Sequence, residues 1–314
     1  MQVLSSLITR PRREIYSNAD QRPTNFSLNK KTFQRHELVI QGKRGKITCS
    51  WYKELGKFRK ICLVYCHGNS GSQLSCEEVL EPTLLSGISL FAFDFSGSGH
   101  SDSEVVSLGH FEKDDIETVV NYIYSQTPNC KIILWGRSMG AAASIFYTYC
   151  NPHISSMVLD SCFSQFSLAA DQIISNYKIV PKFLRTSLLS SASTYIKETY
   201  KFDIMKLNPI DFIKNCKIPT IFIHSIEDKL IDFNHSKALF DNIKGPKCLL
   251  EINGGHSTMR SRLLVVKTLR TIEYFLANGK CTESEKATAR NCLPEFKPNM
   301  AELIRHKRRF NQEL

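Results

Sequence analysis

The sequence predicts an α/β protein with an eight-stranded, mostly parallel sheet, helices on both faces of that sheet and a helical cap. Three observations favour this class: strand-like and helix-like segments alternate along the chain, several strand-like segments are apolar throughout, and one long interval interrupts the alternation. The 314 residues are 42% hydrophobic and 23% charged. This composition is enough to bury a large core and excludes wholesale disorder.

Eight segments have the composition of strands. The first two are separated by a glycine-containing turn, which predicts an antiparallel hairpin. The others are continuous apolar runs, as is typical of strands buried on both faces of a parallel sheet. The predicted strands are 36–41, 46–52, 61–66, 88–95, 131–136, 155–160, 219–225 and 247–253.

Helices are predicted between most of these strands from apolar residues at near-helical spacing, such as Ile116, Val119, Val120 and Ile123. The predicted helices are 72–86, 111–125, 139–150, 234–243 and 258–277. Parallel strands need crossover connections, so these helices are expected to cover both faces of the sheet.

The interval 161–218 interrupts the alternation of strands and helices. It is much longer than the dozen or so residues that are enough to connect two parallel strands. It is rich in aromatic and aliphatic residues, and we predict that 163–205 forms a helical cap over the carboxyl edge of the sheet. The alternative is an ordinary helix pair that packs elsewhere. The globular domain is expected to span 35–280. The flanks 1–34 and 281–314 are polar and basic, and we expect both to be flexible.

Most of the net charge of +11 lies in these flanks, and the densest cluster is Arg305, Lys307, Arg308 and Arg309. One interpretation is a solvated tail, and the other is a weak attraction to an anionic membrane surface. No aromatic residues interleave with these charges, so a nucleic-acid partner is not expected.

Eleven cysteines are scattered along the chain without a C-x-x-C pair, which disfavours a zinc site and indicates buried thiols in a reducing compartment. There is no basic leader followed by a long apolar segment, and no run approaches the ~20 apolar residues of a membrane span. The sequence therefore predicts a cytoplasmic protein, and peripheral contact with membranes through its basic flanks stays the alternative to a solvated tail.

The segment GRSMG, residues 136–140, stands where the fifth predicted strand gives way to a helix. A serine between two glycines at such a corner indicates a nucleophile elbow, in which a sharp turn lifts the serine side chain clear of the sheet. The glycines leave room for that turn. Because this pattern is common by chance, Ser138 is a candidate nucleophile only if its chemical partners are also present.

Those partners are a histidine that takes the serine proton and a carboxylate that orients the histidine. Both are expected in loops after later strands, in the order Ser, acid, His. Asp228 follows the seventh predicted strand, and His256 lies in a glycine-flanked loop after the eighth. We therefore predict a catalytic triad of Ser138, Asp228 and His256.

Three other carboxylates remain alternatives for the acid. Asp160 ends the sixth predicted strand, Glu227 adjoins the favoured aspartate, and Asp232 stands at the start of a helix, where it would serve as an N-cap. His67 and His224 also end strands, but each is expected to lie too close to its own strand to reach the serine.

Two backbone N–H groups are needed to stabilise the oxyanion of an acyl-transfer reaction. One is expected from Met139, directly after the serine, and the other from Asn69 in the loop HGNSGS, 67–72. That loop lacks the lysine of a phosphate-binding P-loop. The segment DFSGSGHSD, 94–102, lacks the third glycine of a dinucleotide site and is expected to shape the wall of the active site.

Taken together, HGNSGS, DFSGSGHSDSE, GRSMGAAAS, VLDSCFS, IHSIEDKLI and NGGHST resemble the motifs of the α/β-hydrolase superfamily over residues 36–278. The sequence is most similar to the branch that holds serine aminopeptidase-type hydrolases (S33-like), monoacylglycerol lipases and depalmitoylase-like enzymes. The resemblance implies the α/β-hydrolase fold, with Ser138, Asp228 and His256 at the triad positions and Asn69 and Met139 at the oxyanion hole.

The resemblance further implies a serine hydrolase that acts on a carboxylic ester or thioester, with an amide as a less favoured substrate because no pocket for a peptide amine is evident. An apolar cap suits an acyl or aromatic substrate group. No metal or organic cofactor is expected. The alternatives are a non-catalytic scaffold, an acyltransferase or a lyase. Depalmitoylase-like members carry an N-terminal cysteine cluster, whereas the first cysteine here is Cys49, so a stable lipid anchor is not expected.

Overall fold

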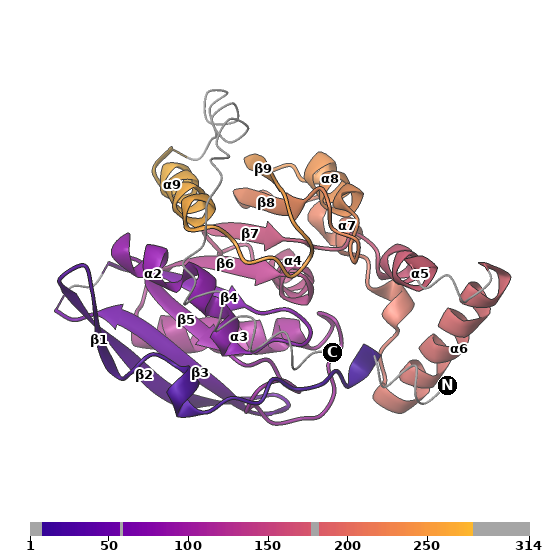
Figure 1. Cartoon of the computed structure of the whole chain (residues 1–314), viewed down its shortest axis with the longest axis horizontal. Helices are drawn as coiled ribbons and strands as arrows, with labels where there is room; N and C mark the ends of the chain where they lie inside the picture. Colours follow the sequence, from indigo (N-terminus) through magenta and orange to yellow (C-terminus); the bar gives the residue numbers. More distant parts are fainter. Residues whose placement is uncertain (1–7, 57–58, 177–181, 279–314) are drawn as a thin grey trace.

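The computed structural model describes residues 8–56, 59–176 and 182–278, and Figure 1 shows them as a twisted sheet flanked by helices. Within this part of the chain, nine strands form one sheet in the order β1-β2-β3-β5-β4-β6-β7-β8-β9. The strands are β1 (Asn25–Leu28), β2 (Lys31–Gly42), β3 (Gly45–Glu54), β4 (Ile61–Cys66), β5 (Ser89–Phe93), β6 (Lys131–Arg137), β7 (Ser156–Asp160), β8 (Thr220–Ser225) and β9 (Lys247–Ile252). The predicted fold class is confirmed, with one strand more than the eight expected.

One end of the sheet is antiparallel and the rest is parallel. β2 and β3 form the predicted hairpin, with Gly42 opposite Gly45, and β1 and β5 pair antiparallel with β2 and β3. All pairs from β5 through β4, β6, β7 and β8 to β9 are parallel. The carboxyl ends of these strands therefore lie along one edge of the sheet, where their loops can meet.

Helices cover both faces of the sheet in the described residues. One face carries α3 (Glu112–Gln126), α4 (Met139–Cys150), α7 (Pro209–Ile213) and α8 (Phe233–Asn242), and the other carries α2 (Glu77–Leu85) and α9 (Arg262–Asn278). Short 3-10 turns occur at η1 (Asn18–Asp20), η2 (Gln73–Cys76) and η3 (Ile204–Lys206).

The central strands are buried on both faces, which explains their continuous apolar runs. On β4, Cys62, Val64 and Cys66 pack into the core beneath α3 and α4, whereas Leu63 and Tyr65 pack into the core beneath α2 and α9. Successive side chains of a strand point to opposite faces, so neither set can be polar. The segment ICLVYC thus forms the middle of the molecule.

The N-terminal segment differs from its prediction. We expected residues 1–34 to be flexible, but in the described part, 8–34, β1 extends the sheet and Tyr16 is buried. The Tyr16 hydroxyl donates a hydrogen bond to Asp94 Oδ2 at 2.6 Å, and its ring stacks on His100 with a centroid distance of 4.1 Å. These anchors are polar and distant in the sequence, so apolar periodicity did not indicate them.

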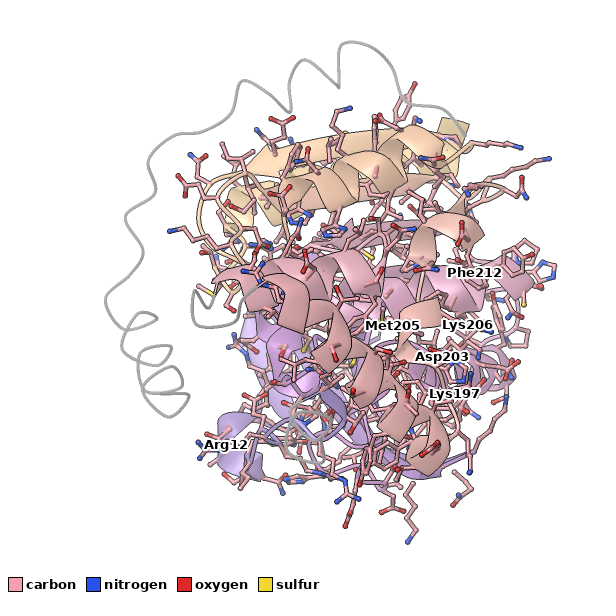
Figure 2. All side chains as sticks on the ribbon, turned by 90° about the vertical axis from the view of Figure 1, so that its right-hand side faces the viewer. Arg12, Lys197, Asp203, Met205, Lys206 and Phe212 are labelled. Carbon is pink, nitrogen blue, oxygen red and sulfur yellow. The ribbon has the colours of Figure 1, made fainter. Side chains whose placement is uncertain are left out.

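The predicted cap interval contains the helices α5 (Phe166–Asn176) and α6 (Lys182–Tyr200), which project to the right of the sheet in Figure 1. Its end is anchored where Phe202 packs against His110 and Phe111, with ring centroids 5.5 and 5.4 Å apart. Figure 2 shows the same region from the side, with Lys197 and Asp203 close together; their Nζ and Oδ2 atoms are 3.4 Å apart. Part of the cap, residues 177–181, lies outside the described residues.

The predicted basic tail also lies outside the described residues, including Arg305, Lys307, Arg308 and Arg309. Within the described part, nine cysteines are free thiols, and seven of these are buried. None of the helices described there is long and apolar enough to cross a membrane.

Candidate active site

Ser138 occupies a strained corner between β6 and α4. Its backbone angles are φ 50° and ψ −112°, a conformation that residues with side chains rarely adopt. A Cβ atom on Gly140 would lie 2.0 Å from the carbonyl oxygen of Cys66, and one on Gly136 would lie 2.4 Å from that of Gly140. The two glycines therefore let α4 pack directly against the sheet, which forces the sharp turn at the serine.

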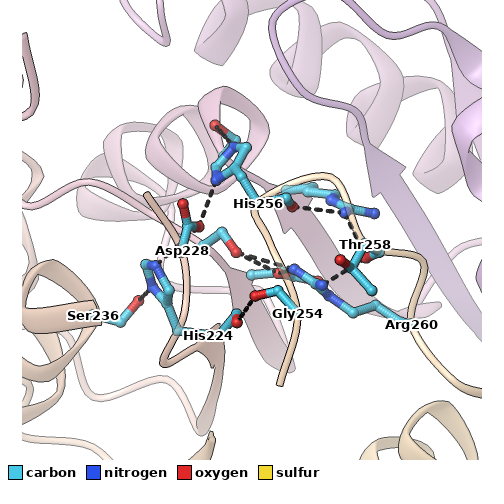
Figure 3. A network of polar contacts seen from close by, with 12 residues as sticks. His224, Asp228, Ser236, Gly254, His256, Thr258 and Arg260 are labelled. Carbon is cyan, nitrogen blue, oxygen red and sulfur yellow. Dashed lines mark hydrogen bonds and ion pairs between the residues drawn. The ribbon is translucent and has the colours of Figure 1, made fainter. Parts of the chain in front are cut away.

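His256 lies between Ser138 and Asp228. Its Nε2 is 3.1 Å from Ser138 Oγ, and its Nδ1 is 2.7 Å from Asp228 Oδ2. In the neutral tautomer with the proton on Nδ1, the imidazole donates to the carboxylate and accepts from the serine hydroxyl. The structure thus brings the three predicted residues into one hydrogen-bonded chain, from loops after β6, β8 and β9. Figure 3 shows the part of this chain that joins His256 to Asp228.

The Asp228 side chain is fully buried and is held as a carboxylate. Its Oδ1 accepts hydrogen bonds from the backbone N–H groups of Leu230 and Ile231, each at 2.9 Å. Burial alone would raise the pKa of Asp228, but the hydrogen bonds from His224 and His256 and the charge of His256 outweigh it and lower that pKa well below the ordinary value. The Asp228 carboxyl group is therefore ionised at neutral pH.

A second histidine contacts the same carboxylate, and the sequence reasoning did not give it a role. His224 Nε2 lies 2.8 Å from the carbonyl oxygen of Ile231 and 3.3 Å from Asp228 Oδ2. Because both are acceptors, Nε2 carries the proton and Nδ1 accepts from the Ser236 hydroxyl at 2.6 Å. The spacing of four residues between His224 and Asp228, at the end of a strand, was the available signal.

The three alternative acids have other partners in the structure. Asp160 forms a two-pronged ion pair with Arg260, Glu227 accepts from the backbone N–H of Gly254 at 2.9 Å, and Asp232 caps α8 through the N–H of Asn234 at 2.8 Å. None of these interactions involves an imidazole. Asp228 is the acid that the geometry pairs with His256.

The two predicted oxyanion donors flank the serine. Met139 is the first residue of α4, and the first N–H groups of a helix have no partner within that helix. The loop after β4 runs past the elbow, since a Cβ atom on Gly68 would lie 3.8 Å from Ser138 Cβ. In the next residue, the Oδ1 atom of Asn69 is buried without a hydrogen-bond partner. The role of both backbone donors stays a prediction.

The neighbouring loops are held in place by buried polar groups. His67 donates from Nδ1 to the carbonyl of Gly68 at 2.7 Å and accepts at Nε2 from the N–H of Phe95 at 3.0 Å, and burial lowers its pKa. Asp94 accepts from the N–H groups of Gln73 and His100 at 2.7 and 2.8 Å. Segment 94–102 is thereby joined to the loop that contains Asn69.

Among the described residues, no three His, Cys, Asp or Glu side chains are arranged to hold a metal ion. The chemistry that Ser138, His256 and Asp228 support is proton transfer and nucleophilic attack by their own side chains.

Comparisons with known proteins agree with this architecture. A family model described as the alpha/beta hydrolase fold matches residues 61–194, from β4 into the cap. The uncharacterized Bacillus subtilis protein YqkD is 25% identical over 219 residues, which cover 69% of this chain and 71% of that protein. The human alpha/beta hydrolase domain-containing protein 17B is 25% identical over 240 residues, which cover 70% and 68% of the two chains.

A solved structure of similar fold is the esterase Pf2001 from Pyrococcus furiosus. It superposes with a TM-score of 0.58 at 18% identity, over 77% of this chain and 92% of the esterase chain. At this identity the likeness concerns the arrangement of the sheet and its helices.

Proposed function

We propose that this chain is a serine hydrolase of the α/β-hydrolase superfamily, and that it cleaves a carboxylic ester or thioester through an acyl-enzyme. The observation that carries the proposal is the hydrogen-bonded chain from Ser138 through His256 to a buried, ionised Asp228. Such a chain activates a serine hydroxyl that is otherwise a poor nucleophile.

In the first half-reaction, Ser138 Oγ attacks the substrate carbonyl carbon while His256 Nε2 accepts the hydroxyl proton. Asp228 fixes the tautomer of His256 and stabilises the imidazolium that forms. The backbone N–H groups of Asn69 and Met139 donate to the oxyanion. As the tetrahedral intermediate collapses, the bond to the leaving oxygen or sulfur breaks, and His256 returns its proton to that atom.

In the second half-reaction, His256 removes a proton from a water molecule, whose oxygen attacks the acyl carbon of the ester on Ser138. Collapse of this second intermediate breaks the bond to Ser138 Oγ, which regains the proton from His256. The products are a carboxylic acid and the free enzyme. The same residues thus serve as base and acid in turn.

An apolar acyl group is the substrate feature that the surface near the triad favours. Ile226 and Leu230 lie two residues before and two residues after Asp228. Met259 lies three residues after His256. The side chains of Ile226, Leu230 and Met259 are exposed. Leu168 on the cap helix α5 is exposed as well. Pockets for small molecules are lined mainly by apolar side chains. The esterase name of the Pyrococcus protein supports an ester bond, and resemblance to the depalmitoylase-like branch supports a thioester.

The test is turnover of acyl esters and acyl thioesters of increasing chain length by the purified chain, with Ser138→Ala as the control. We expect hydrolysis that rises with chain length and disappears in Ser138→Ala. Transfer of the acyl group to an added alcohol in preference to water would assign an acyltransferase. A folded wild type that forms no acyl-enzyme with any member of the series would assign a binding scaffold.

A further inference from the structure

The loop that carries His256 has little apolar packing of its own. Residues 253, 255 and 257–259 are exposed, and Gly254 has a φ of +103° that suits glycine alone. A loop with few buried contacts is usually mobile relative to the core. The separation between His256 and Ser138 must therefore be maintained by polar contacts made to this loop.

Arg137, the residue directly before the nucleophile, makes such contacts. Its Nη2 donates to the carbonyl oxygens of His256 and Thr258, each at 3.0 Å. Its Nη1 donates to both carboxylate oxygens of Glu78 at 2.7 and 2.9 Å. One guanidinium thus joins the elbow, the histidine loop and helix α2.

Glu78 extends the connection to the far end of the histidine loop. Its side chain is nearly fully buried, and it also accepts from the hydroxyl of Tyr65 at 2.9 Å and from the backbone N–H of Arg260 at 3.1 Å. Burial lowers the pKa of Arg137, but the charges of Glu78 and Asp160 outweigh this and raise it further. The Arg137 guanidinium therefore stays charged at every pH at which the protein is folded.

Arg260 fixes the same loop a second time. Its Nη1 donates to the carbonyl of Thr258 at 2.7 Å, so that carbonyl accepts from two arginines, and its remaining nitrogens bind Asp160. Figure 3 shows Thr258 and Arg260 next to His256, with the contacts between guanidinium and carbonyl groups dashed. A planar guanidinium fork presents several donors in a fixed geometry, which a lysine does not match.

We propose that Arg137 is a positioning residue that sets the distance between His256 and Ser138 by clamping the backbone of the histidine loop. The proposal rests on the proposed function. Arg137 is joined to the nucleophile by a peptide bond and to the backbone of His256 by a hydrogen bond. A misplacement of about 1 Å between reacting groups can slow a reaction by ~10²-fold.

The decisive variant is the double substitution Arg137→Met with Glu78→Gln. The single change Arg137→Met leaves the Glu78 carboxylate buried without its ion-pair partner and lowers stability. In the double variant, the neutral amide introduced by Glu78→Gln can still accept from the N–H of Arg260 and carries no charge. Arg59→Gln is the matched control. Arg59 lies just before β4, away from the carboxyl edge of the sheet. Its side chain binds the Glu273 carboxylate and the carbonyl oxygen of Ser86.

Two measurements are made on the wild type and on each variant. The first is the low-field proton resonance of His256 Nδ1–H in its hydrogen bond to Asp228, assigned with His256→Asn and His224→Asn. The second is the rate at which a fluorophosphonate labels Ser138. We expect the double variant to recover most of the thermal stability lost by Arg137→Met, but to have a broadened or absent resonance and a labelling rate lower by ~10²-fold.

Arg59→Gln should match the wild type in both measurements. A double variant that recovers the wild-type resonance and the wild-type labelling rate together with its stability would overturn the proposal, leaving Arg137 with a purely structural role. If the resonance responds as expected while the wild type is never labelled, the positioning role stands and the proposed hydrolase function fails.

Discussion

Asp160 and Asp228 lie at the carboxyl ends of the neighbouring parallel strands β7 and β8, and both side chains are fully buried. In both cases burial opposes ionisation and the partners reverse its effect, so both pKa values are lowered. The partners differ in kind. Asp160 faces the guanidinium of Arg260, whereas Asp228 faces the imidazoles of His224 and His256.

That difference in partner assigns a different task to each carboxylate. A guanidinium keeps its proton at all accessible pH values, so the pair of Asp160 and Arg260 is a permanent connection between β7 and the histidine loop. An imidazole gains and loses a proton near neutral pH, so the pair of Asp228 and His256 can take part in proton transfer. Equal burial and similar position therefore do not imply equal function.

The largest expected effect comes from Asp228→Asn. An amide NH₂ that faces His256 Nδ1 would move the imidazole proton from Nδ1 to Nε2. The protonated Nε2 can then no longer accept a hydrogen bond from the Ser138 hydroxyl. We expect kcat to fall by about 10⁴-fold, as measured by ester turnover. The thermal midpoint, measured by circular dichroism, should fall less than in Asp160→Asn, because the amide oxygen can still accept from the N–H groups of Leu230 and Ile231. Glu227→Gln, one residue away, is the control and should retain activity; equal losses in the two variants would contradict the assignment.

Asp160→Asn should act on stability. It leaves Arg260 buried without a charged partner, and we expect the free energy of unfolding to fall by about 3–5 kcal/mol in denaturant titrations. Activity per folded molecule should fall far less than in Asp228→Asn. A variant of wild-type stability that had lost 10⁴-fold in kcat would instead make Asp160 the catalytic acid.

His224→Asn tests the second imidazole. Hydrogen bonds to charged groups are worth about 1.5 kcal/mol or more, so losing this long contact to Asp228 should reduce kcat by about tenfold. Ser236→Ala is the matched control, because it removes the hydrogen bond to His224 Nδ1 without changing a contact of Asp228. If the two variants lose the same activity, His224 serves the packing of α8 only.

The smallest expected effect is the change in the free energy of unfolding when the pH is lowered. An unfolded aspartate has a pKa of about 3.9, whereas Asp160 and Asp228 have lowered values in the fold, so the unfolded chain takes up protons first as the pH drops. Stability should therefore be fully present above about pH 4 and decline below it, by at most ~1.4 kcal/mol per pH unit for each group. Asp160→Asn should flatten this decline, and the exposed Asp241→Asn should not.

The sequence predicted most strands of the sheet, because each of these strands depends on a local pattern of residues. Buried runs such as ICLVYC require two apolar faces, and GRSMG at the end of β6 requires a tight corner. The positions of the loops that carry Asp228 and His256 could be predicted because each loop directly follows a strand, β8 or β9.

What the sequence did not predict depends on polar contacts between distant residues. Tyr16 reaches Asp94 across 78 positions, and Arg137 reaches the carbonyl of His256 across 119. Neither contact can be recognised from the spacing of residues in the sequence. The extra strand β1 was missed for a related reason, since its four residues are partly exposed and do not form an apolar run.

The central claim is that Ser138 is activated by the chain through His256 to Asp228. Labelling of the purified protein with a fluorophosphonate probe, compared with Ser138→Ala and Asp228→Asn, tests it most directly. We expect rapid labelling of the wild type, none in Ser138→Ala and a rate lower by about 10⁴-fold in Asp228→Asn. Labelling that persists in Ser138→Ala, or a folded wild type that is not labelled, would contradict it.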